Sequence, residues 1–138
     1  MRTYVLFVLV LFPSALLGQS INDRYEKFIN QHINPGMNWS RCDTEMHDRN
    51  ISITDKNQCK ETNTFIKAGI EEIKNVCNAA GKLHRKIMVS NQRFPIVTCK
   101  LKRNHVFPNC KYDGQSAEKR IVIECEDGLP VHFKRDLD

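Results

Sequence analysis

Three side chains stand out by their type and setting: His32, His132 and Lys60. An imidazole can accept or donate a proton near neutral pH, so two histidines brought together could act as a base and an acid. Lys60 directly follows Cys59, and a disulfide there would hold the lysine backbone still while its ammonium group reaches an anion. Any one of these residues alone more often has a structural role or none, so their meaning depends on the elements that position them.

The first half of the chain has the apolar spacing of helices. The first helix is expected to begin near Ser20 or Asn22 and to end at 34–36. One face of this helix carries a mainly apolar stripe that contains Tyr25, Phe28, Ile29 and His32. A second short helix is expected around 42–49. A third is expected over about 65–77, where one face carries Ile66, Ile70, Ile73 and Cys77.

The second half changes to short segments rich in β-branched and aromatic residues. These segments predict strands at 86–89, 96–101, 110–112, 119–124 and 131–134. Asp127-Gly128 is typical of a hairpin turn between the last two strands. In the last strand, His132 lies on the polar face and Phe133 on the apolar one. Helices followed by an antiparallel sheet indicate an α+β fold.

The N-terminus predicts the compartment. Arg2 precedes a short apolar run that ends in small residues, which is typical of a secretory signal peptide and too short for a membrane span. We expect residues 1–18 to be removed after Gly18, or alternatively after Ser20. Residues 19–138 then form one domain of a secreted protein, and no other segment is apolar enough to anchor it.

The cysteines and the charge narrow the class further. The chain has 138 residues, six cysteines and a formal net charge of +5. No Cys-x-x-Cys pair is present, so a structural zinc site is not expected. Three disulfides are expected in a secreted chain, with all 15 pairings left open by spacing. The positive charge favours anionic partners such as nucleic acid, anionic glycans or bacterial surfaces. Asn38 and Asn50 begin N-glycosylation sequons.

Three motifs together resemble the pancreatic-type ribonuclease superfamily. Residues 59–65 read CKETNTF and are similar to that family's C-K-x-x-N-T-F signature. Gln31-His32 follows a helix that carries aromatic residues, and residues 130–133 read PVHF, like the C-terminal histidine motif of the family. The six-cysteine set and Gln19 are most similar to the angiogenin branch. The resemblance covers about residues 25–133.

The resemblance implies a ribonuclease A-like fold, in which three helices pack on a curved antiparallel sheet and the two histidines face each other across a cleft. It also implies a cis bond before Pro108. The implied disulfides join Cys42 to Cys99, Cys59 to Cys110, and Cys77 to Cys125.

The resemblance further implies cleavage of single-stranded RNA, including tRNA, on the 3′ side of pyrimidines, through a 2′,3′-cyclic phosphate and without metal or other cofactor. His32 would be the base, His132 the acid and Lys60 the charge-stabilising group. Thr64 would read the pyrimidine. The other substrate-contacting residues implied are Gln31, Asn63, Phe133 and Glu126, the last in a second base site. A monomer is the expected state, and binding of a leucine-rich ribonuclease inhibitor, which is usual in the family, is left open.

Two positions depart from the family pattern. Lys134 stands where the family has an Asp that orients its C-terminal histidine, and Arg135 stands where angiogenins block the pyrimidine pocket with Gln. We therefore expect weaker activity than that of the digestive enzyme. The alternative function is a cationic effector, angiogenic or antimicrobial, that binds cell surfaces through the basic segments 82–86 and 100–103. No arginine run matches the one linked to nuclear entry, so nuclear uptake stays open.

Overall fold

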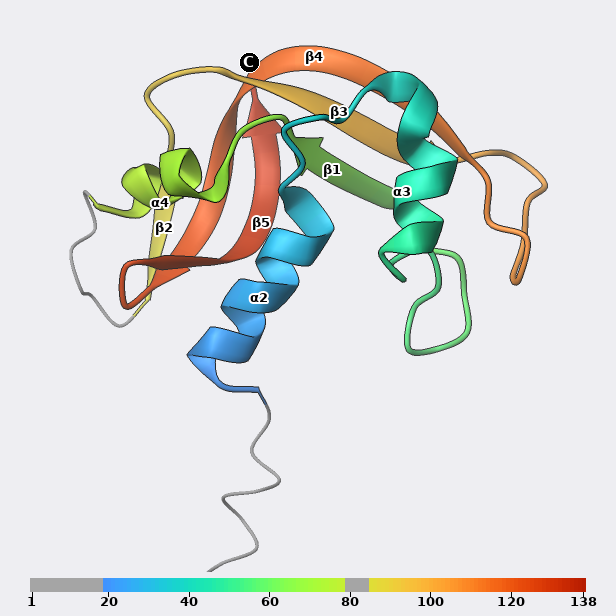
Figure 1. The fold of residues 1–138 in the computed structure, drawn as a ribbon, viewed down its shortest axis with the longest axis horizontal. Helices are drawn as coiled ribbons and strands as arrows, with labels where there is room; N and C mark the ends of the chain where they lie inside the picture. The colour runs from blue at the N-terminus through green and yellow to red at the C-terminus, as the bar shows by residue number, and fades with distance from the viewer. Residues whose placement is uncertain (1–18, 79–84) are drawn as a thin grey trace, which may run out of the picture.

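The computed structural model describes residues 19–78 and 85–138 (Figure 1). The signal-peptide segment, cleavage after Gly18, and Lys82 and His84 of the basic segment lie outside the described residues. The helices are α2 (Ile21–His32), the 3-10 turn η1 (Trp39–Arg41), α3 (Cys42–Asp48) and α4 (Ile70–Asn78). The strands are β1 (Thr62–Ile66), β2 (Lys86–Val89), β3 (Phe94–Leu101), β4 (Tyr112–Glu126) and β5 (Leu129–Leu137).

Helix α2 begins and ends where the sequence predicts. The Ser20 hydroxyl caps it by accepting a hydrogen bond from the Asp23 amide at 3.1 Å. Phe28 and His32, four residues apart, are buried on the same face. Helix α2 packs mainly against β5, between α4 at one end of the molecule and α3 at the other (Figure 1). The sequence thus carries His32 to the sheet on the last turn of a helix.

The long strand β4 joins two parts of the antiparallel sheet. Its first half, Tyr112–Lys119, pairs with β3, which in turn pairs with β1. Its second half pairs with β2 on one side and β5 on the other. At the β4–β5 turn, Asp127 and Gly128 both have positive φ, at 53° and 78°, which confirms the predicted hairpin.

Two cores pack on the sheet because alternate residues of a strand point to opposite faces. On β3, Phe94 and Ile96 face one core, while Val97 and Cys99 face the other. The first, called here the histidine core, contains Phe28, Ile33, Ile66, Ala68, Ile73, Cys77, Phe94, Ile96, Ile121, Ile123 and Cys125. The second, called the lysine core, contains Met37, Cys42, Met46, Ile51, Phe65, Val97, Cys99 and Tyr112.

Two element predictions need correction. The third helix begins at Ile70, and residues 62–66 form β1 instead. Phe65 and Ile66 are both fully buried, one in each core, so β1 shows no alternation and its apolar residues fit a helical spacing by coincidence. Only Tyr112 of the strand expected at 110–112 is in a strand, and it begins β4, which also contains the whole segment expected at 119–124.

Gly114 of β4 lies against the backbone of η1. A Cβ at this position would collide with the Trp39 carbonyl and lie 2.9 Å from the Cys42 Sγ atom. The glycine therefore lets η1 pack directly on the strand. A residue that is typical of turns in sequence here allows the close approach of two backbones.

The three disulfides join Cys42 to Cys99, Cys59 to Cys110 and Cys77 to Cys125, which confirms the implied pairing. The first ties α3 to β3 in the lysine core, and the third ties α4 to β4 in the histidine core. The Phe107–Pro108 bond is cis, as the resemblance implies. Among the described residues, no helix is long and apolar enough to cross a membrane.

Candidate active site

His32 is the last residue of α2 and its imidazole is held on three sides. The ring lies between Phe28, with centroids 5.3 Å apart, and Phe133, which stacks on it at 5.2 Å. Its Nδ1 atom is 2.8 Å from the Thr64 carbonyl oxygen. Since a carbonyl only accepts, Nδ1 carries the proton in this contact and the neutral ring presents the lone pair of Nε2.

Burial, against the opposing hydrogen bond to Thr64 and together with the nearby charges of Lys60 and His132, lowers the pKa of His32 to about 4. The imidazole of the folded protein is therefore neutral at pH 7. A neutral imidazole with a free Nε2 atom has the form that a general base requires.

Lys60 is fixed through its backbone. Its amide donates to the Ser52 carbonyl at 2.8 Å, and its own carbonyl accepts from the Tyr112 hydroxyl at 2.6 Å. Burial, followed by the charge of Asp43, raises the pKa of Tyr112 to about 12, so this hydroxyl stays a donor. The Lys60 Nζ atom donates to Asn63 Oδ1 at 2.9 Å. Burial, followed by the charge of Lys27, lowers the pKa of Lys60.

His132 differs from His32 because it is exposed on β5. Partial burial lowers its pKa, with further lowering by Lys134, Lys60 and Arg24 and opposition from Glu124.

The three residues meet at the junction of two hollows. His32, Lys60, His132 and Gln31 line both a hollow of about 670 Å³ and an adjoining one of about 480 Å³. The structure thus brings together residues that are up to 100 positions apart in sequence. A group bound at this junction would contact two imidazoles and one ammonium group.

The smaller hollow contains the residues expected to read a base. Thr64, paired with Thr98 across β1 and β3, lines it, and so do Arg135 and Asp136 of β5. Within residues 19–78 and 85–138, no hydrogen bond joins Arg135 to Thr64. Arg135 therefore borders this hollow without bonding to its threonine. Threonine hydroxyls can both donate and accept, which suits recognition of either pyrimidine.

The larger hollow is basic. Arg24 and Lys27 of α2, together with Arg49 after α3, line it, along with one acidic residue, Asp55. Arg24 pairs with Glu126 and Arg49 with Glu45, so Lys27 is the cation of this group best placed to bind a phosphate of a polyanionic chain. No sequence motif marks Lys27 or Arg49, and the only signal for Lys27 is a cation five residues before His32.

The remaining predicted site residues divide into two groups. Gln31 and the half-buried Phe133 line the smaller hollow. Asn63 lines it too, but its side-chain amide is used internally, since Nδ2 donates to the Gln31 carbonyl at 2.8 Å. Glu126 is buried, forms an ion pair with Arg24 and lines neither hollow. Contact of Glu126 with a second base stays a prediction.

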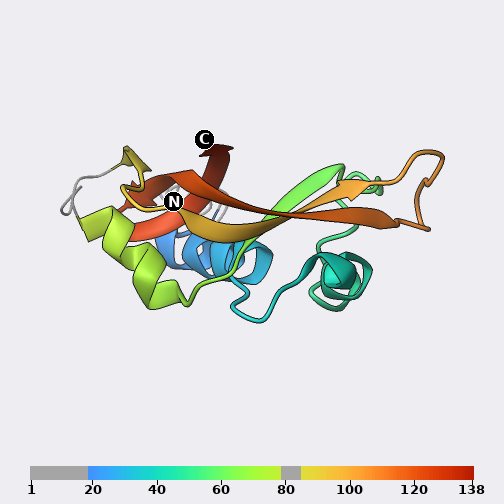
Figure 2. The same cartoon turned by 90° about the horizontal axis from the view of Figure 1, so that it is seen from above.

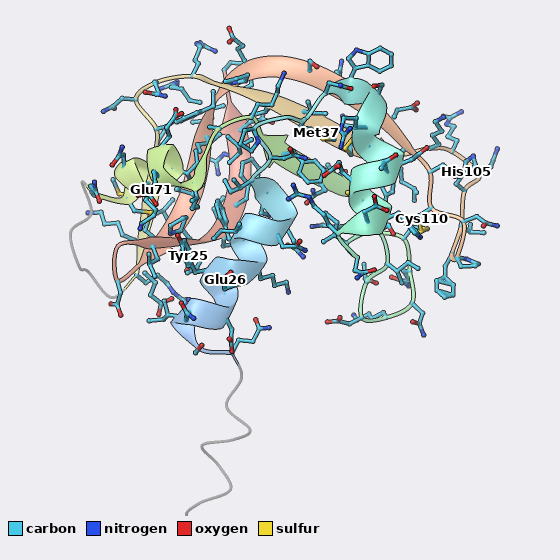
Figure 3. The ribbon with its side chains drawn as sticks, in the orientation of Figure 1. Tyr25, Glu26, Met37, Glu71, His105 and Cys110 are labelled. Atoms are coloured by element: carbon cyan, nitrogen blue, oxygen red, sulfur yellow. A yellow bond between two sulfur atoms is a disulfide. The ribbon has the colours of Figure 1, made fainter. Side chains whose placement is uncertain are left out.

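The other histidines of the described segments, His47 and His105, line neither hollow. His47 is exposed beside Asp48, with Nδ1 3.3 Å from Oδ1. His105 lies at the end of the molecule opposite to Glu71 of α4 (Figure 3). Asn38 and Asn50 are both exposed, so the structure leaves both sequons accessible, and their glycosylation stays a prediction.

Comparison with known proteins gives consistent matches. The family model described as pancreatic ribonuclease matches residues 23–134. The chain is 34% identical to Ribonuclease-like 3 of Danio rerio, in an alignment covering 98% of this chain and 95% of the relative. It is 36% identical to angiogenin of Oryctolagus cuniculus, with 96% and 90% covered.

Solved structures agree with these matches. The X-ray structure of zebrafish RNase5 superposes with a TM-score of 0.75 at 43% identity and covers 83% of this chain and 95% of that one. Green turtle egg white ribonuclease gives 0.71 at 33% identity, with 83% and 98% covered. With both sequence and fold matched over most of its length, the chain belongs to the pancreatic ribonuclease family, in its angiogenin-like branch, and is a pancreatic-type endoribonuclease.

Proposed function

We propose that this endoribonuclease cleaves single-stranded RNA, including tRNA, on the 3′ side of pyrimidines by acid–base transphosphorylation without a metal. The observation that carries the proposal is the meeting of His32, Lys60 and His132 at one junction of two hollows. The free Nε2 of His32 suits a base, and the exposed His132 suits an acid. The predicted signal peptide supports action outside the cell.

The proposed reaction uses the 2′-hydroxyl of RNA as its nucleophile. His32 Nε2 takes the proton from this hydroxyl while its oxygen forms a bond to phosphorus. The bond between phosphorus and the 5′-oxygen breaks, and protonated His132 donates its proton to that oxygen. The products are a 2′,3′-cyclic phosphate and a free 5′-hydroxyl. DNA lacks the nucleophile and is not a substrate.

Lys60 has a separate role in the proposal. Its ammonium group stabilises the negative charge that builds up on the phosphoryl oxygens as the fifth bond to phosphorus forms. Gln31 and the backbone amide of Phe133 bind the same phosphate. The pyrimidine on the 2′-hydroxyl side occupies the smaller hollow beside Thr64, and the rest of the RNA chain lies along the cations of the larger one.

The test is cleavage of a pyrimidine–purine dinucleotide and of tRNA by the oxidised protein. His32→Ala and His132→Ala should each lower kcat/KM by about 10²–10⁴-fold. His47→Ala, an exposed histidine outside both hollows, is the matched control. The same dinucleotide with a 2′-deoxyribose should resist cleavage. Full activity of either site variant would overturn the assignment.

The same assay predicts the pH dependence of kcat/KM. The neutral form of His32 disappears as the pH falls through about 4, and the protonated form of His132 disappears as it rises through a pKa below the usual 6.5. Activity should therefore follow a bell with its maximum on the acid side of pH 6.5. A maximum well above pH 7 would contradict these roles.

We propose a second function, attachment to anionic cell surfaces, for the β3–β4 loop. This loop extends beyond the sheet at the end that carries α3 (Figure 2). Val106 and Phe107 are 71% and 42% exposed at its tip. Lys102 and Arg103, on the same loop, are exposed too. Apolar side chains beside cations suit an anionic lipid surface.

Binding to vesicles tests this second proposal. Vesicles containing phosphatidylglycerol should bind the protein, and phosphatidylcholine vesicles should not. Charge reversal at Lys102 and Arg103 should abolish vesicle binding and leave dinucleotide cleavage unchanged. His32→Ala should abolish cleavage and leave vesicle binding unchanged. Arg85 is unsuitable for this test because it pairs with Glu124 beside His132. Equal binding to both vesicle types would contradict the proposal.

A further inference from the structure

Glu124 of β4 lies directly across from His132 of β5. Residues directly opposite in an antiparallel pair lie on the same face, with Cβ atoms about 4.5–5.5 Å apart. The β4–β5 register shifts on either side, between Val122 and Ile123 and between Glu124 and Cys125. Such irregularities redirect side chains, so this pairing is set locally and does not follow from a regular ladder.

The carboxylate of Glu124 is held in place. Its side chain is only 14% exposed, and Oε2 forms an ion pair with the Arg85 Nε atom at 2.7 Å. Glu124, Arg85 and His132 line the same hollow of about 240 Å³. Among the described residues, no hydrogen bond or ion pair joins this carboxylate to His132, so Glu124 acts on the imidazole through its charge across the shared hollow.

The other charges around His132 are mainly positive. Lys134 lies two residues along β5, Arg24 faces it from α2, Lys60 from the segment before β1, and Arg85 from the segment before β2. His32 is the remaining titratable neighbour. Glu126 pairs with Arg24, and Asp136 lines the smaller hollow with His132, so Glu124 is the one carboxylate among the described residues that line the 240 Å³ hollow beside His132. Without it, nearby cations would favour loss of the proton that an acid must hold.

We infer that Glu124, paired with Arg85, is a positioning residue that acts through His132 and keeps its imidazole protonated. This inference rests on the proposed function, since it concerns the acid of that reaction. A carboxylate near an imidazole stabilises the imidazolium form through its charge. Glu124 thereby offsets Lys134, which lies on the same strand as the histidine and repels its proton.

The experiment is an NMR titration of His132 in the whole oxidised protein. Glu124→Gln, which conserves shape, should lower the pKa of His132 by about half a unit or more. Glu124→Asp should restore most of the shift. Lys134→Gln should change the pKa in the opposite direction. Glu118→Gln, an exposed glutamate farther along β4, is the matched control and should leave it unchanged.

Kinetics provide the second readout. In Glu124→Gln, the alkaline limb of kcat/KM should move to lower pH by the same amount as the pKa, with KM unchanged. An unshifted pKa in folded Glu124→Gln, or an equal shift in Glu118→Gln, would overturn the inference. If Glu124→Gln does not fold, Arg85→Gln removes the ion pair instead and must move the same pKa. A wild type with a Glu124-dependent pKa but no RNA cleavage would refute the proposed function alone.

Discussion

The histidine core and the lysine core contribute to the site in different ways. The histidine core holds His32 by packing, since Phe28 of that core and the adjacent Phe133 contact the imidazole ring. The lysine core holds Lys60 through its backbone, since Tyr112 of that core bonds to the Lys60 carbonyl. The base is thus fixed by side-chain contacts, and the ammonium group by hydrogen bonds one residue from a disulfide.

His32 and Lys60 therefore differ in how tightly their side chains are held. A buried ring between aromatic neighbours has little freedom, and its low pKa follows from the same burial. A lysine on a fixed backbone keeps a mobile side chain, which here rests on Asn63. Since Asn63 also bonds to Gln31, it links the two sides of the site. Damage to the histidine core should alter proton transfer, whereas damage to the lysine core should alter charge stabilisation.

Among the changes near the lysine core, removal of the Lys60 ammonium group should lower kcat the most. Lys60→Ala should lower kcat by about 10²–10³-fold, as for loss of a group that stabilises transition-state charge. The free energy of unfolding should change little, because the backbone hydrogen bonds of Lys60 remain. Lys56→Ala, an exposed lysine of the same segment, is the control for dinucleotide turnover. A loss below tenfold would remove Lys60 from the proposed mechanism.

Lowering the pH should decrease the free energy of unfolding through protonation of His32. The folded-state pKa of His32 is about 4 and its unfolded value is 6.5, so the unfolded chain binds the extra proton between these values. Stability due to neutral His32 is therefore complete above pH 6.5 and is lost as the pH falls towards 4, by on the order of 3 kcal/mol. Urea unfolding of the wild type and His32→Gln at about pH 7 and about pH 4 measures this difference. An equal pH dependence in both proteins would contradict it.

Gly114→Ala should loosen the lysine core alone. The added Cβ collides with the Trp39 carbonyl and crowds the Cys42 sulfur, so η1 must move away from β4. We expect a loss of about 1–3 kcal/mol in the free energy of unfolding. Gly36→Ala, where the nearest atom is 3.9 Å away, should change it by less than about 1 kcal/mol. The pKa of His32 should stay unchanged in both; a shift in Gly114→Ala would show that the cores are coupled.

Tyr112→Phe should have the smallest effect. It removes the hydrogen bond to the Lys60 carbonyl and should lower the free energy of unfolding by about 1 kcal/mol. Turnover should fall by less than tenfold, because the ammonium group remains. Tyr25→Phe on α2, which also removes a tyrosine hydroxyl, is the control for the free energy of unfolding and for turnover. If Tyr112→Phe lowered kcat as much as Lys60→Ala, backbone placement would be as important as the charge.

Local patterns predicted helix α2 and the Asp127-Gly128 turn, because α2 buries one face and the turn needs particular residue types. Strand β2 followed from its β-branched residues alone, since only Met88 is partly buried. Strand β1 was not predicted, because Phe65 and Ile66 are buried in different cores. The close approach of η1 to β4 depends on Gly114, through a contact between residues about 75 positions apart that no local pattern contains.

The sequence by itself determined the chemistry available to this protein: two histidines, a lysine beside a half-cystine, and three motifs that identify the family. It also implied which cysteines pair, through the resemblance. Only the tertiary structure decided that Glu126 is occupied by Arg24, that Glu124 faces His132, and that Arg135 borders the smaller hollow without bonding to Thr64. These contacts depend on strand register and on charges from distant segments, which residue types alone do not specify.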